Sequence, residues 1–389
     1  MQRKYIHQLA DWPEFQWDQE QLLNLLAQVR HDQGRLTGRV EALGFTLRAE
    51  AELKTLTLDV LKSSEIEGEI LDVGQVRSSV ARRLGIDIGG LEHVDRHVDG
   101  LVEMMLNATR QYQEPLTTER LFNWQAAMFP QAEGATKSGR SGMTKISVGA
   151  WRTDANGPMQ VISGPGPGGN AFAFGKETVH FEAPAADRID EDMGAFLDWL
   201  KSEVAVDPVL KAGLAHLWFV TIHPFDDGNG RLARAITGMM LARSEQSSQR
   251  FYSMSIQIRK ERKDYYQILE RTQSGSMDVT GWLKWFLGCL SRALSDAQDT
   301  LSSVLRKADF WNRLRAHTIN SRQQTMLNRI LDNEFKGKLT TSKWAKMTKC
   351  SQDTAYRDIS ELIAAGVLSK NPGGGRSTSY SLADQVNES

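Results

Sequence analysis

Cysteine is scarce in this chain, whose 389 residues include only Cys289 and Cys350. Neither belongs to a Cys-x-x-Cys pair, which argues against a cysteine zinc site and against a disulfide framework. Long apolar runs are also missing. None approaches the roughly 18 residues that span a bilayer, and the N-terminal residues lack the apolar core of a secretion signal. We therefore expect a soluble, cytoplasmic protein that does not enter the membrane.

An excess of charge of one sign is absent as well. The chain has 47 Lys and Arg against 48 Asp and Glu, a net charge of -1. This balance argues against a uniformly basic nucleic-acid coat, although it allows a local basic patch. What is present is an ordinary globular composition, with 40% hydrophobic and 24% charged residues. At about 150 residues per domain, the length predicts two or three domains.

Apolar residues recur at helical spacing along most of the chain, so the predicted fold class is mainly α. The pattern covers residues 17–62, resumes over 92–130 and returns in several segments between 188 and 315. The predicted domains are an N-terminal helical region (1–62), a central core (63–300) and a C-terminal domain (301–389).

Residues 131–184 have a different pattern, because Gly, Ser and Pro cluster there. The run at 164–169 contains only Gly and Pro and cannot be helical. Short apolar stretches at 159–162 and 178–181 flank it, which predicts a β-hairpin flap. Long loops in compact domains are often functional, and we assign the flap to residues 146–184.

The C-terminal domain shows the order helix, turn, helix, hairpin, which is typical of a winged helix-turn-helix domain. Between Lys336 and Arg376, eight basic residues against three acidic ones give a local charge of +5. This pattern leaves open whether the domain binds DNA or docks protein. If it binds DNA, Thr354, Tyr356 and Arg357 on the second helix and Arg376 on the wing are the expected contacts.

The densest group of polar residues lies at 223–234, where the sequence reads HPFDDGNGRLAR. Gly228 and Gly230 let the backbone approach a ligand closely, and the free N–H groups of a helix that begins there favour an anion. Arg231 and Arg234 are three residues apart and share a helix face. Two guanidinium groups beside an anion-binding turn indicate a polyphosphate ligand.

His223 and Asp227 add reactive groups to this loop. A histidine can act as a general base near neutral pH, and a carboxylate suits a Mg2+ that is held mainly by phosphates and water. Together with the two arginines, they predict phosphoryl or nucleotidyl transfer to a hydroxyl group.

This loop resembles the signature of the Fic family, H-x-F-x-[D/E]-G-N-G-R-x-x-R, at every specified position, and the resemblance covers about residues 60 to 300. It implies a Fic helical core that transfers AMP from ATP to a Ser, Thr or Tyr hydroxyl of a target protein. By the same resemblance His223 deprotonates that hydroxyl, Phe225 anchors the loop and Asp227 holds Mg2+. The implied nucleotide-binding residues are Gly228, Asn229, Gly230, Arg231 and Arg234, with Tyr265 and Tyr266 at the base. Gly230 favours nucleotidyl transfer over the phosphorylation of the Doc branch.

The flap also fits this resemblance. Fic enzymes hold the target segment against a hairpin by strand-like pairing, which implies docking at Val161, Ile162 and His180. For His180, the alternative to target docking is a structural role. The histidines His93 and His97 have the i, i+4 spacing of metal ligands, but acidic neighbours favour a solvated helix face.

A short segment ahead of the core resembles the inhibitory motif of the family, [S/T]-x-x-x-E-[G/N], at Ser63, Glu67 and Gly68. We place it on an inhibitory helix at 63–69 that Ser63 or Ser64 caps. The resemblance implies that Glu67 pairs with Arg234 and takes the place of the γ-phosphate. The alternative is an exposed acidic residue without a regulatory role.

Two alternative functions remain open at this point. The Fic core could be a nucleotide sensor in a transcriptional regulator, or the same site could remove AMP as well as add it. The sequence also leaves open the nucleotide base, the target protein and whether the chain forms a homodimer.

Overall fold

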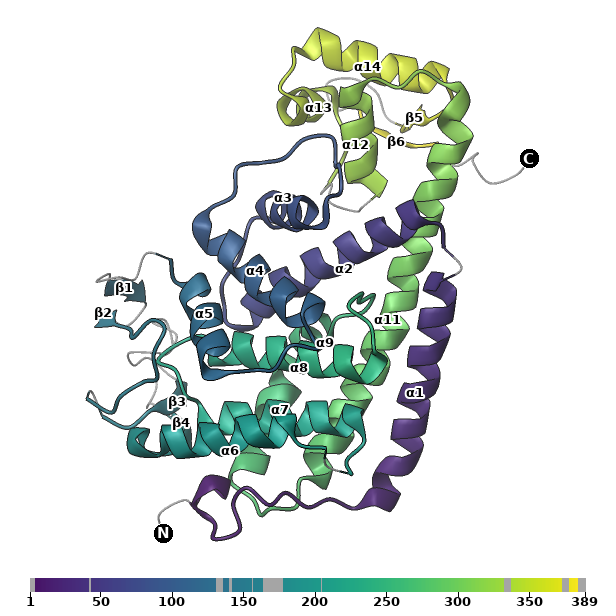
Figure 1. The fold of residues 1–389 in the computed structure, drawn as a ribbon. Coiled ribbons are helices and arrows are strands. Elements are labelled where there is room, and N and C mark those ends of the chain that lie inside the picture. The colour runs from purple at the N-terminus through teal and green to yellow at the C-terminus, as the bar shows by residue number, and fades with distance from the viewer. Residues whose placement is uncertain are drawn as a thin grey trace. The chain divides into compact units, whose positions relative to one another are not determined.

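The computed structural model describes residues 4–41, 43–130, 136–139, 142–155, 157–163, 178–203, 205–331, 337–372 and 378–383. They form two compact units, one of Met1–Ile86 with Leu91–Gln298 and one of Asp87–Gly90 with Asp299–Ser389. Helices dominate both units, and the few strands form two-stranded hairpins (Figure 1). The predicted mainly α fold class is confirmed.

The larger unit contains ten complete helices in the described residues and the first part of an eleventh. They are α1 (Gln19–Glu41), α2 (Phe45–Ile66), α3 (Val73–Leu84), α4 (Arg96–Arg110), α5 (Thr118–Met128), α6 (Ile189–Lys201), α7 (Pro208–Ile222), α8 (Asn229–Glu245), α9 (Met254–Lys260), α10 (Arg262–Gln273) and α11 (Thr280–Arg313). The 3-10 turns η1 (Ile6–Gln8) and η2 (Ala186–Arg188) also belong to this unit. The sequence pattern did not assign α3 or α9.

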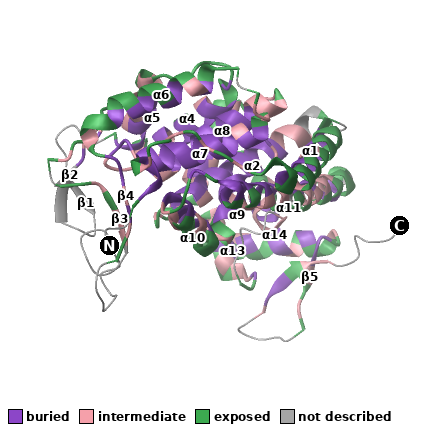
Figure 2. Ribbon diagram, turned by 90° about the horizontal axis from the view of Figure 1, so that it is seen from below, coloured by how far each residue is buried: buried purple, intermediate pink, exposed green. Residues whose placement is uncertain are grey.

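Helices α7 and α8 lie side by side and form the centre of the larger unit (Figure 1). Buried residues concentrate in both (Figure 2). Every residue of α7 from Leu214 to Ile222 is buried, as expected for a helix that is apolar on all sides. It begins with Pro208 in its first turn, after Asp207 accepts the amide of Val209. The signature loop therefore joins two helices that cannot move freely.

The predicted hairpin arms are confirmed by β3 (Gln160–Ser163) and β4 (Thr178–Glu182), which pair antiparallel with a bulge between Val161 and Ile162. The tip, residues 164–177, lies outside the described residues. A further antiparallel hairpin, which the sequence pattern did not indicate, joins β1 (Thr136–Gly139) to β2 (Gly142–Lys145).

The predicted start of a helix at Ser63 is wrong, because α2 runs without a break from Phe45 to Ile66. Ser63 and Ser64 are buried within its last turns rather than at an N-cap. Apolar residues on both sides of residue 62, including Val60, Leu61 and Ile66, are buried against neighbouring helices, which extends the helix. The expected inhibitory motif therefore lies at a helix C-terminus.

The smaller unit contains the end of α11, η3 (Leu314–Ala316), α12 (Ser321–Leu331), α13 (Thr341–Thr348), α14 (Gln352–Ala364) and the antiparallel strands β5 (Leu368–Lys370) and β6 (Tyr380–Leu382). Its core is built around Trp344, Met326 and Ile359, which are fully buried. Gly366 ends the second helix of the turn with φ of 70°, as its sequence position predicts.

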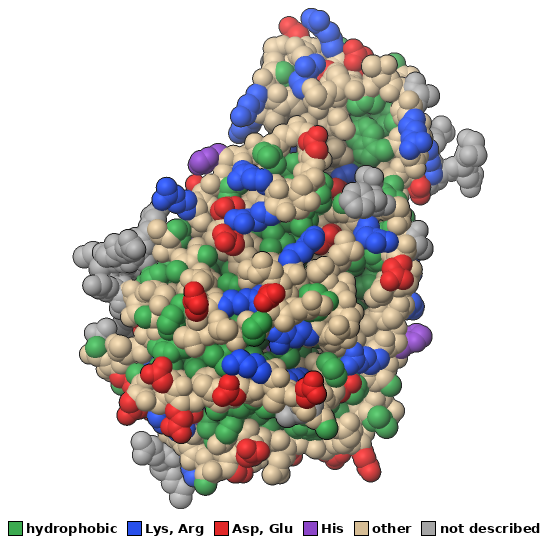
Figure 3. Space-filling model, viewed as in Figure 1, with side chains coloured by type: hydrophobic (Ala, Val, Ile, Leu, Met, Phe, Trp, Pro, Cys, Tyr) green, Lys and Arg blue, Asp and Glu red, His purple; other side chains and the backbone are tan. Residues whose placement is uncertain are grey.

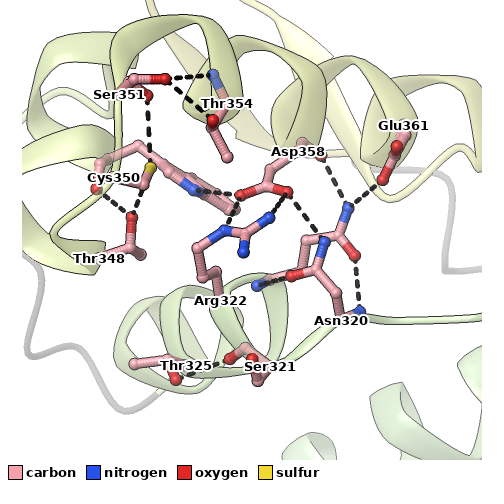
Figure 4. A network of polar contacts seen from close by, with 12 residues as sticks. Asn320, Ser321, Arg322, Thr325, Thr348, Cys350, Ser351, Thr354, Asp358 and Glu361 are labelled. Carbon is pink, nitrogen blue, oxygen red and sulfur yellow. Dashed lines mark hydrogen bonds and ion pairs between the residues drawn. The ribbon is translucent and has the colours of Figure 1, made fainter.

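A buried carboxylate ties α12 to α14 in this unit. Asp358 is 2% exposed and accepts hydrogen bonds from Arg322 at 2.8 and 2.9 Å, from Asn320 at 2.9 Å and from the indole of Trp344 at 3.3 Å (Figure 4). Because a buried charge needs such partners, this network fixes the packing of the two helices.

The face of the larger unit seen in Figure 3 carries Lys and Arg interspersed with Asp and Glu, in line with the near-zero net charge. None of the helices in the described part of the chain has the length and hydropathy needed to cross a membrane.

Candidate active site

His223 lies where α7 ends, with left-handed backbone angles of φ 53° and ψ 57°. Its own amide donates to the carbonyl of Phe219 at 3.0 Å, which closes the helix. Its ring Nδ1 lies 3.3 Å from the carbonyl of Val220. A carbonyl can only accept a hydrogen bond, so Nδ1 carries the hydrogen and Nε2 keeps a lone pair.

The environment keeps this imidazole neutral. Burial lowers the pKa of His223 to about 4, and the guanidinium of Arg152 acts in the same direction against the opposing effects of Val220, Glu67 and Asp227. At neutral pH the side chain is therefore a base with a free Nε2.

The side chain of Asn229 holds the loop together. Its Oδ1 accepts the amide of Phe225 at 3.0 Å, and its Nδ2 donates to the carbonyl of Phe225 at 2.7 Å. Phe225 is fully buried, with ring centroids 5.0 Å from Trp151 and 6.2 Å from Phe122, so its expected anchoring position is observed. These two bonds give Asn229 a loop-holding role, whereas a direct contact with phosphate stays a prediction.

Two residues that sequence reasoning did not select join the flap to the loop. The side chain of Arg152 is fully buried and donates to the carbonyl of His223 at 2.8 Å and to the carbonyl of Pro184. Asp226 accepts the amide of Ser147 at 2.8 Å. Both contacts cross more than 30 residues of chain, so no local pattern indicates them.

The start of α8 offers an anion site. Its N-cap is Gly228, which provides no side-chain acceptor for the first amides of the helix, and such unsatisfied donors favour a negative charge. Asp227 accepts the amide of Gly228 at 2.6 Å, and its Oδ1 lies 3.5 Å from Nη2 of Arg231. Arg231 and Arg234 project from the first turns of the helix and are each 4% exposed.

A glutamate from α2 occupies this site. Glu67 Oε1 lies 2.8 Å from Nη2 of Arg234 and so close to the backbone that a Cβ at Gly230 would be 2.1 Å away. Ser63 completes the contact, because its Oγ and its carbonyl each accept from Arg234 at 2.9 Å. The structure thus brings the three expected motif residues together with the second signature arginine, with Gly68 in the turn that follows at φ of 83°.

A second carboxylate covers the other arginine. Glu69 Oε2 lies 2.9 Å from Nη1 of Arg231, and its Oε1 lies 2.5 Å from Nε2 of His97. The expectation of a solvated face is therefore wrong for His97, whose Nδ1 also contacts the carbonyl of Met128 at 2.7 Å. The i, i+4 spacing of His93 and His97 could not indicate either partner of His97, because Glu69 and Met128 belong to other elements.

Tyr265 is 2% exposed, and its hydroxyl lies 2.8 Å from Nε2 of His216. It is therefore a buried neighbour of the site, and its contact with a base stays a prediction. Burial raises the pKa of the Tyr265 hydroxyl. Tyr266 is 37% exposed, with the guanidinium of Arg262 5.3 Å from its ring centroid, and its contact with a base stays a prediction.

The flap residues differ in their surroundings. Val161 packs against the buried cluster of Tyr5, Phe181 and Ala183. His180 Nδ1 lies 2.8 Å from Glu270 of α10, which agrees with its structural alternative. Ile162 is half-buried beside the bulge.

The expected DNA contacts in the smaller unit also differ. Tyr356 is 58% exposed and Arg357 is exposed on α14. Thr354 lies in the first turn of this helix, where Ser351 is the N-cap: the amide of Thr354 donates to Ser351 Oγ at 3.2 Å and the two hydroxyls lie 2.9 Å apart (Figure 4). Arg376 lies outside the described residues.

Comparison with known proteins gives two matches to family models. The model described as the Fic/DOC family matches residues 115–241, and one described as a domain of unknown function (DUF4172) matches residues 5–86. The chain is 34% identical over 113 residues to protein adenylyltransferase Fic of Nematostella vectensis, over 28% of this chain and 25% of that protein. It is 25% identical over 238 residues to protein adenylyltransferase Fic of Drosophila grimshawi, over 60% of this chain and 41% of that protein. The chain therefore spans less than half of these relatives' length.

Two solved structures are also similar to this chain, at low sequence identity. A Fic family protein from Desulfovibrio desulfuricans is 20% identical, with a TM-score of 0.49 over 94% of this chain and 96% of that one. Residues 134–508 of Fic-1 from C. elegans are 19% identical, with a TM-score of 0.45 over 72% of this chain and 74% of that one. From the family match and the complete signature loop, we conclude that this chain carries a domain of the Fic/DOC family over residues 115–241.

Proposed function

We propose that this protein is a protein adenylyltransferase that transfers AMP from ATP to a side-chain hydroxyl of a target protein. The observation that carries the proposal is the neutral His223, with its free Nε2, on a loop that leads directly into an uncapped helix N-terminus and two buried arginines. This set combines a base with a polyphosphate site, as transfer to a hydroxyl requires. Relatives named protein adenylyltransferase support the choice of AMP as the transferred group.

In the proposed reaction, Nε2 of His223 takes the proton of the target hydroxyl. The hydroxyl oxygen forms a bond to the α-phosphorus, and the bond between that phosphorus and the bridging oxygen of the β-phosphate breaks, which releases pyrophosphate. Arg231 and Arg234 hold the outer phosphates and neutralise charge that develops on the leaving group. Arg152 and Asn229 keep the loop in position through the contacts described above.

The residues present fit a Mg2+ ion of the kind that nucleotides bring. Among the described residues, no three His, Cys, Asp or Glu side chains gather as they would around a protein-held metal. Asp227 is the acidic residue of the signature. Its side chain is 40% exposed and lies 3.5 Å from Arg231 of the anion site. One carboxylate suits a Mg2+ that phosphates and water otherwise coordinate. When bound, the ion would neutralise phosphate charge.

We further propose that Glu67 inhibits the enzyme. A carboxylate on Arg234 at the start of α8 occupies the position that the γ-phosphate needs, and like charges cannot share it. ATP binds productively only after Glu67 leaves. The flap, with Val161, Ile162 and His180 at its arms, is the proposed docking edge for the target segment.

The test uses ATP that is labelled either at the α-phosphate or at the γ-phosphate, with Glu67→Gly and the double variant Glu67→Gly/His223→Ala, in the presence of cell lysate. The proposal expects protein label from the α-position only, and none in the double variant. Label from the γ-position would indicate phosphorylation. Loss of label from protein modified beforehand would indicate AMP removal by the same site.

A second candidate function belongs to the smaller unit. The exposure of Tyr356 and Arg357 on α14, the second helix of the helix-turn-helix order, supports DNA binding. A gel shift with the DNA upstream of the coding sequence, measured over a range of salt concentrations, tests it. Arg357→Ala should weaken the shift, and an absence of any shift at low salt contradicts DNA binding.

A further inference from the structure

The side chain of Glu69 bridges two basic side chains that come from different helices. One oxygen lies 2.9 Å from Arg231 of α8, and the other lies 2.5 Å from His97 of α4. The second nitrogen of His97 faces the carbonyl of Met128 at 2.7 Å. Both ring nitrogens of His97 are therefore engaged, and the His97 imidazole and the Arg231 guanidinium hold the same carboxylate between them.

The end of α2 explains why Glu67 and Glu69 reach the site together. The amide of Gly68 donates to the carbonyl of Glu65 at 3.1 Å, and the amide of Glu69 donates to the carbonyl of Ser64 at 3.0 Å. With Gly68 at φ of 83°, these bonds form a Schellman cap. The cap reverses the chain after Glu67, so the two acidic side chains emerge from one rigid turn toward Arg234 and Arg231.

Arg231 is prepared for more bonds than Glu69 supplies. It is 4% exposed, and its buried Nε has no hydrogen-bond partner. An unsatisfied donor on a buried guanidinium is costly, which favours a ligand with several acceptor oxygens, such as a polyphosphate. Glu69 contacts Nη1 of this guanidinium at 2.9 Å, as Glu67 contacts Arg234, while the nearest oxygen of Asp227 is farther away, 3.5 Å from Nη2.

The turn is exposed enough to be displaced. Glu69 and His97 have side chains that are 34% and 32% exposed, and the next residue, Ile70, is 88% exposed. Residues 67–70 therefore bury no apolar side chain. The ion pairs of Glu67 and Glu69 are the side-chain contacts that stabilise the position of the turn.

We propose that Glu69 is a second inhibitory carboxylate, which competes with nucleotide phosphates for Arg231, and that His97 anchors it there. This inference rests on the proposed function only in assigning Arg231 to the phosphates. The two carboxylates act as one element, so removal of Glu67 alone leaves Arg231 still covered. Full access for ATP requires the whole turn to move.

The test compares the dissociation constants of ATP and AMP, measured by calorimetry with Mg2+ present, for the wild type, Glu69→Gln, His97→Gln and Glu65→Gln. Glu65 is the matched control, because it lies on the same helix end but pairs with Lys62 at 2.7 Å and Arg259 at 3.3 Å. We expect Glu69→Gln to tighten ATP binding about three- to tenfold, the range for a partly exposed charged contact. The affinity for AMP and the effect of Glu65→Gln should stay within about twofold of the wild type.

A His97→Gln variant should tighten ATP binding in the same direction and by less, because it releases Glu69 without removing it. It also keeps the test decisive if Glu69→Gln does not fold, as judged by thermal unfolding. An unchanged ATP affinity in both variants, or equal tightening in Glu65→Gln, overturns the inference.

A separate transfer assay distinguishes this inference from the proposed function. If Glu67→Gly transfers AMP but Glu67→Gly/Glu69→Gln binds ATP no more tightly, the second carboxylate is rejected and the function stands. If Glu69→Gln tightens ATP binding while no variant transfers AMP, the function is rejected and the role of Glu69 at Arg231 stands.

Discussion

The backbone at His223 is held in a conformation that few residues other than glycine adopt. It is one of three non-glycine residues with positive φ in the described chain, and such angles persist where surrounding contacts impose them. Here the contacts are the bond from Arg152 to the carbonyl of His223 and the paired bonds of Asn229 to Phe225. They fix the backbone of the loop between α7 and α8.

Replacement of Arg152 tests this dependence. Arg152→Met removes donors to three loop segments and leaves buried carbonyls unpaired, which should lower the free energy of unfolding by about 2–4 kcal/mol and reduce AMP transfer. Urea unfolding and the transfer assay measure the two effects. Arg83→Met is the control, because the side chain of Arg83 is 30% exposed in its pair with Asp99 and should cost about 1 kcal/mol or less. Equal stability of the two variants contradicts the role of Arg152.

At this scale the sequence indicated the signature residues but not the residues that hold them. His223, Asp227, Arg231 and Arg234 are close in sequence, and the helix period alone places the two arginines on one face. Arg152 and Glu69 reach the loop from 71 and 162 residues away, and a single sequence carries no record of such pairings. The burial of Tyr265 could not be predicted either, because its helix position does not show which face is buried.

Among the elements, the cap at the end of α2 decides where the inhibitory side chains point. A Cβ at Gly68 would meet no atom within 4 Å, so the cost of a side chain there arises from its positive φ alone. The same holds for Gly366 in the smaller unit, where φ is 70° and the space is also open. The two glycines form a matched pair.

Gly68→Ala should therefore destabilise the protein by about 1 kcal/mol and raise basal AMP transfer, because relief of the strain moves Glu67 away from Arg234. Gly366→Ala should have a similar backbone cost without any change in transfer. Thermal unfolding and label incorporation check both variants. If Gly68→Ala lowers the stability but leaves AMP transfer unchanged, the cap does not contribute to inhibition.

The type of most elements could be predicted from apolar periodicity, but their ends could not. The helix expected to begin at Ser63 is the end of one that starts at Phe45, because buried apolar residues on both sides of the motif outweigh the capping preference of serine. The helix-turn-helix order could be predicted from the sequence, whereas nothing in the sequence indicated that Asp358, at the centre of this unit, is buried.

Asp358→Asn tests that element directly. The asparagine cannot pair with the guanidinium of Arg322 and places a donor among the donors of Asn320 and Trp344, so the smaller unit should lose about 3 kcal/mol of stability. Urea unfolding followed by the fluorescence of the smaller unit's tryptophans measures the loss. Glu361→Gln, on the same helix and exposed, keeps an oxygen that can accept the bond from Gln323 and should change stability by about 1 kcal/mol or less.

For the whole molecule, buried histidines link stability to pH. Burial lowers the pKa of His7 to about 4 and that of His216 to about 3. Below pH 6.5 the unfolded chain binds protons that these two folded-state side chains do not, so the free energy of unfolding should fall as pH decreases from 6.5 toward 4. The slope is about 1.4 kcal/mol per pH unit for each such histidine.

Urea unfolding at pH 7 and pH 5 measures this dependence, with His216→Gln as the comparison. Burial also raises the pKa of Glu52 and Glu245, which acts in the opposite direction near pH 5. The decisive comparison is therefore between the two proteins: the free energy of unfolding should depend less steeply on pH in His216→Gln than in the wild type. Identical slopes in the wild type and the variant contradict the link.

Protein label from ATP that is labelled at the α-phosphate tests whether neutral His223 activates the target hydroxyl for AMP transfer and whether Glu67 on Arg234 restrains that transfer. We predict weak label with the wild type and none with His223→Ala. Glu67→Gly should give at least about tenfold more label, because loss of the carboxylate frees the buried guanidinium of Arg234 for the phosphates. Equal label with the wild type and Glu67→Gly would contradict the restraint, and label with His223→Ala would contradict the chemistry.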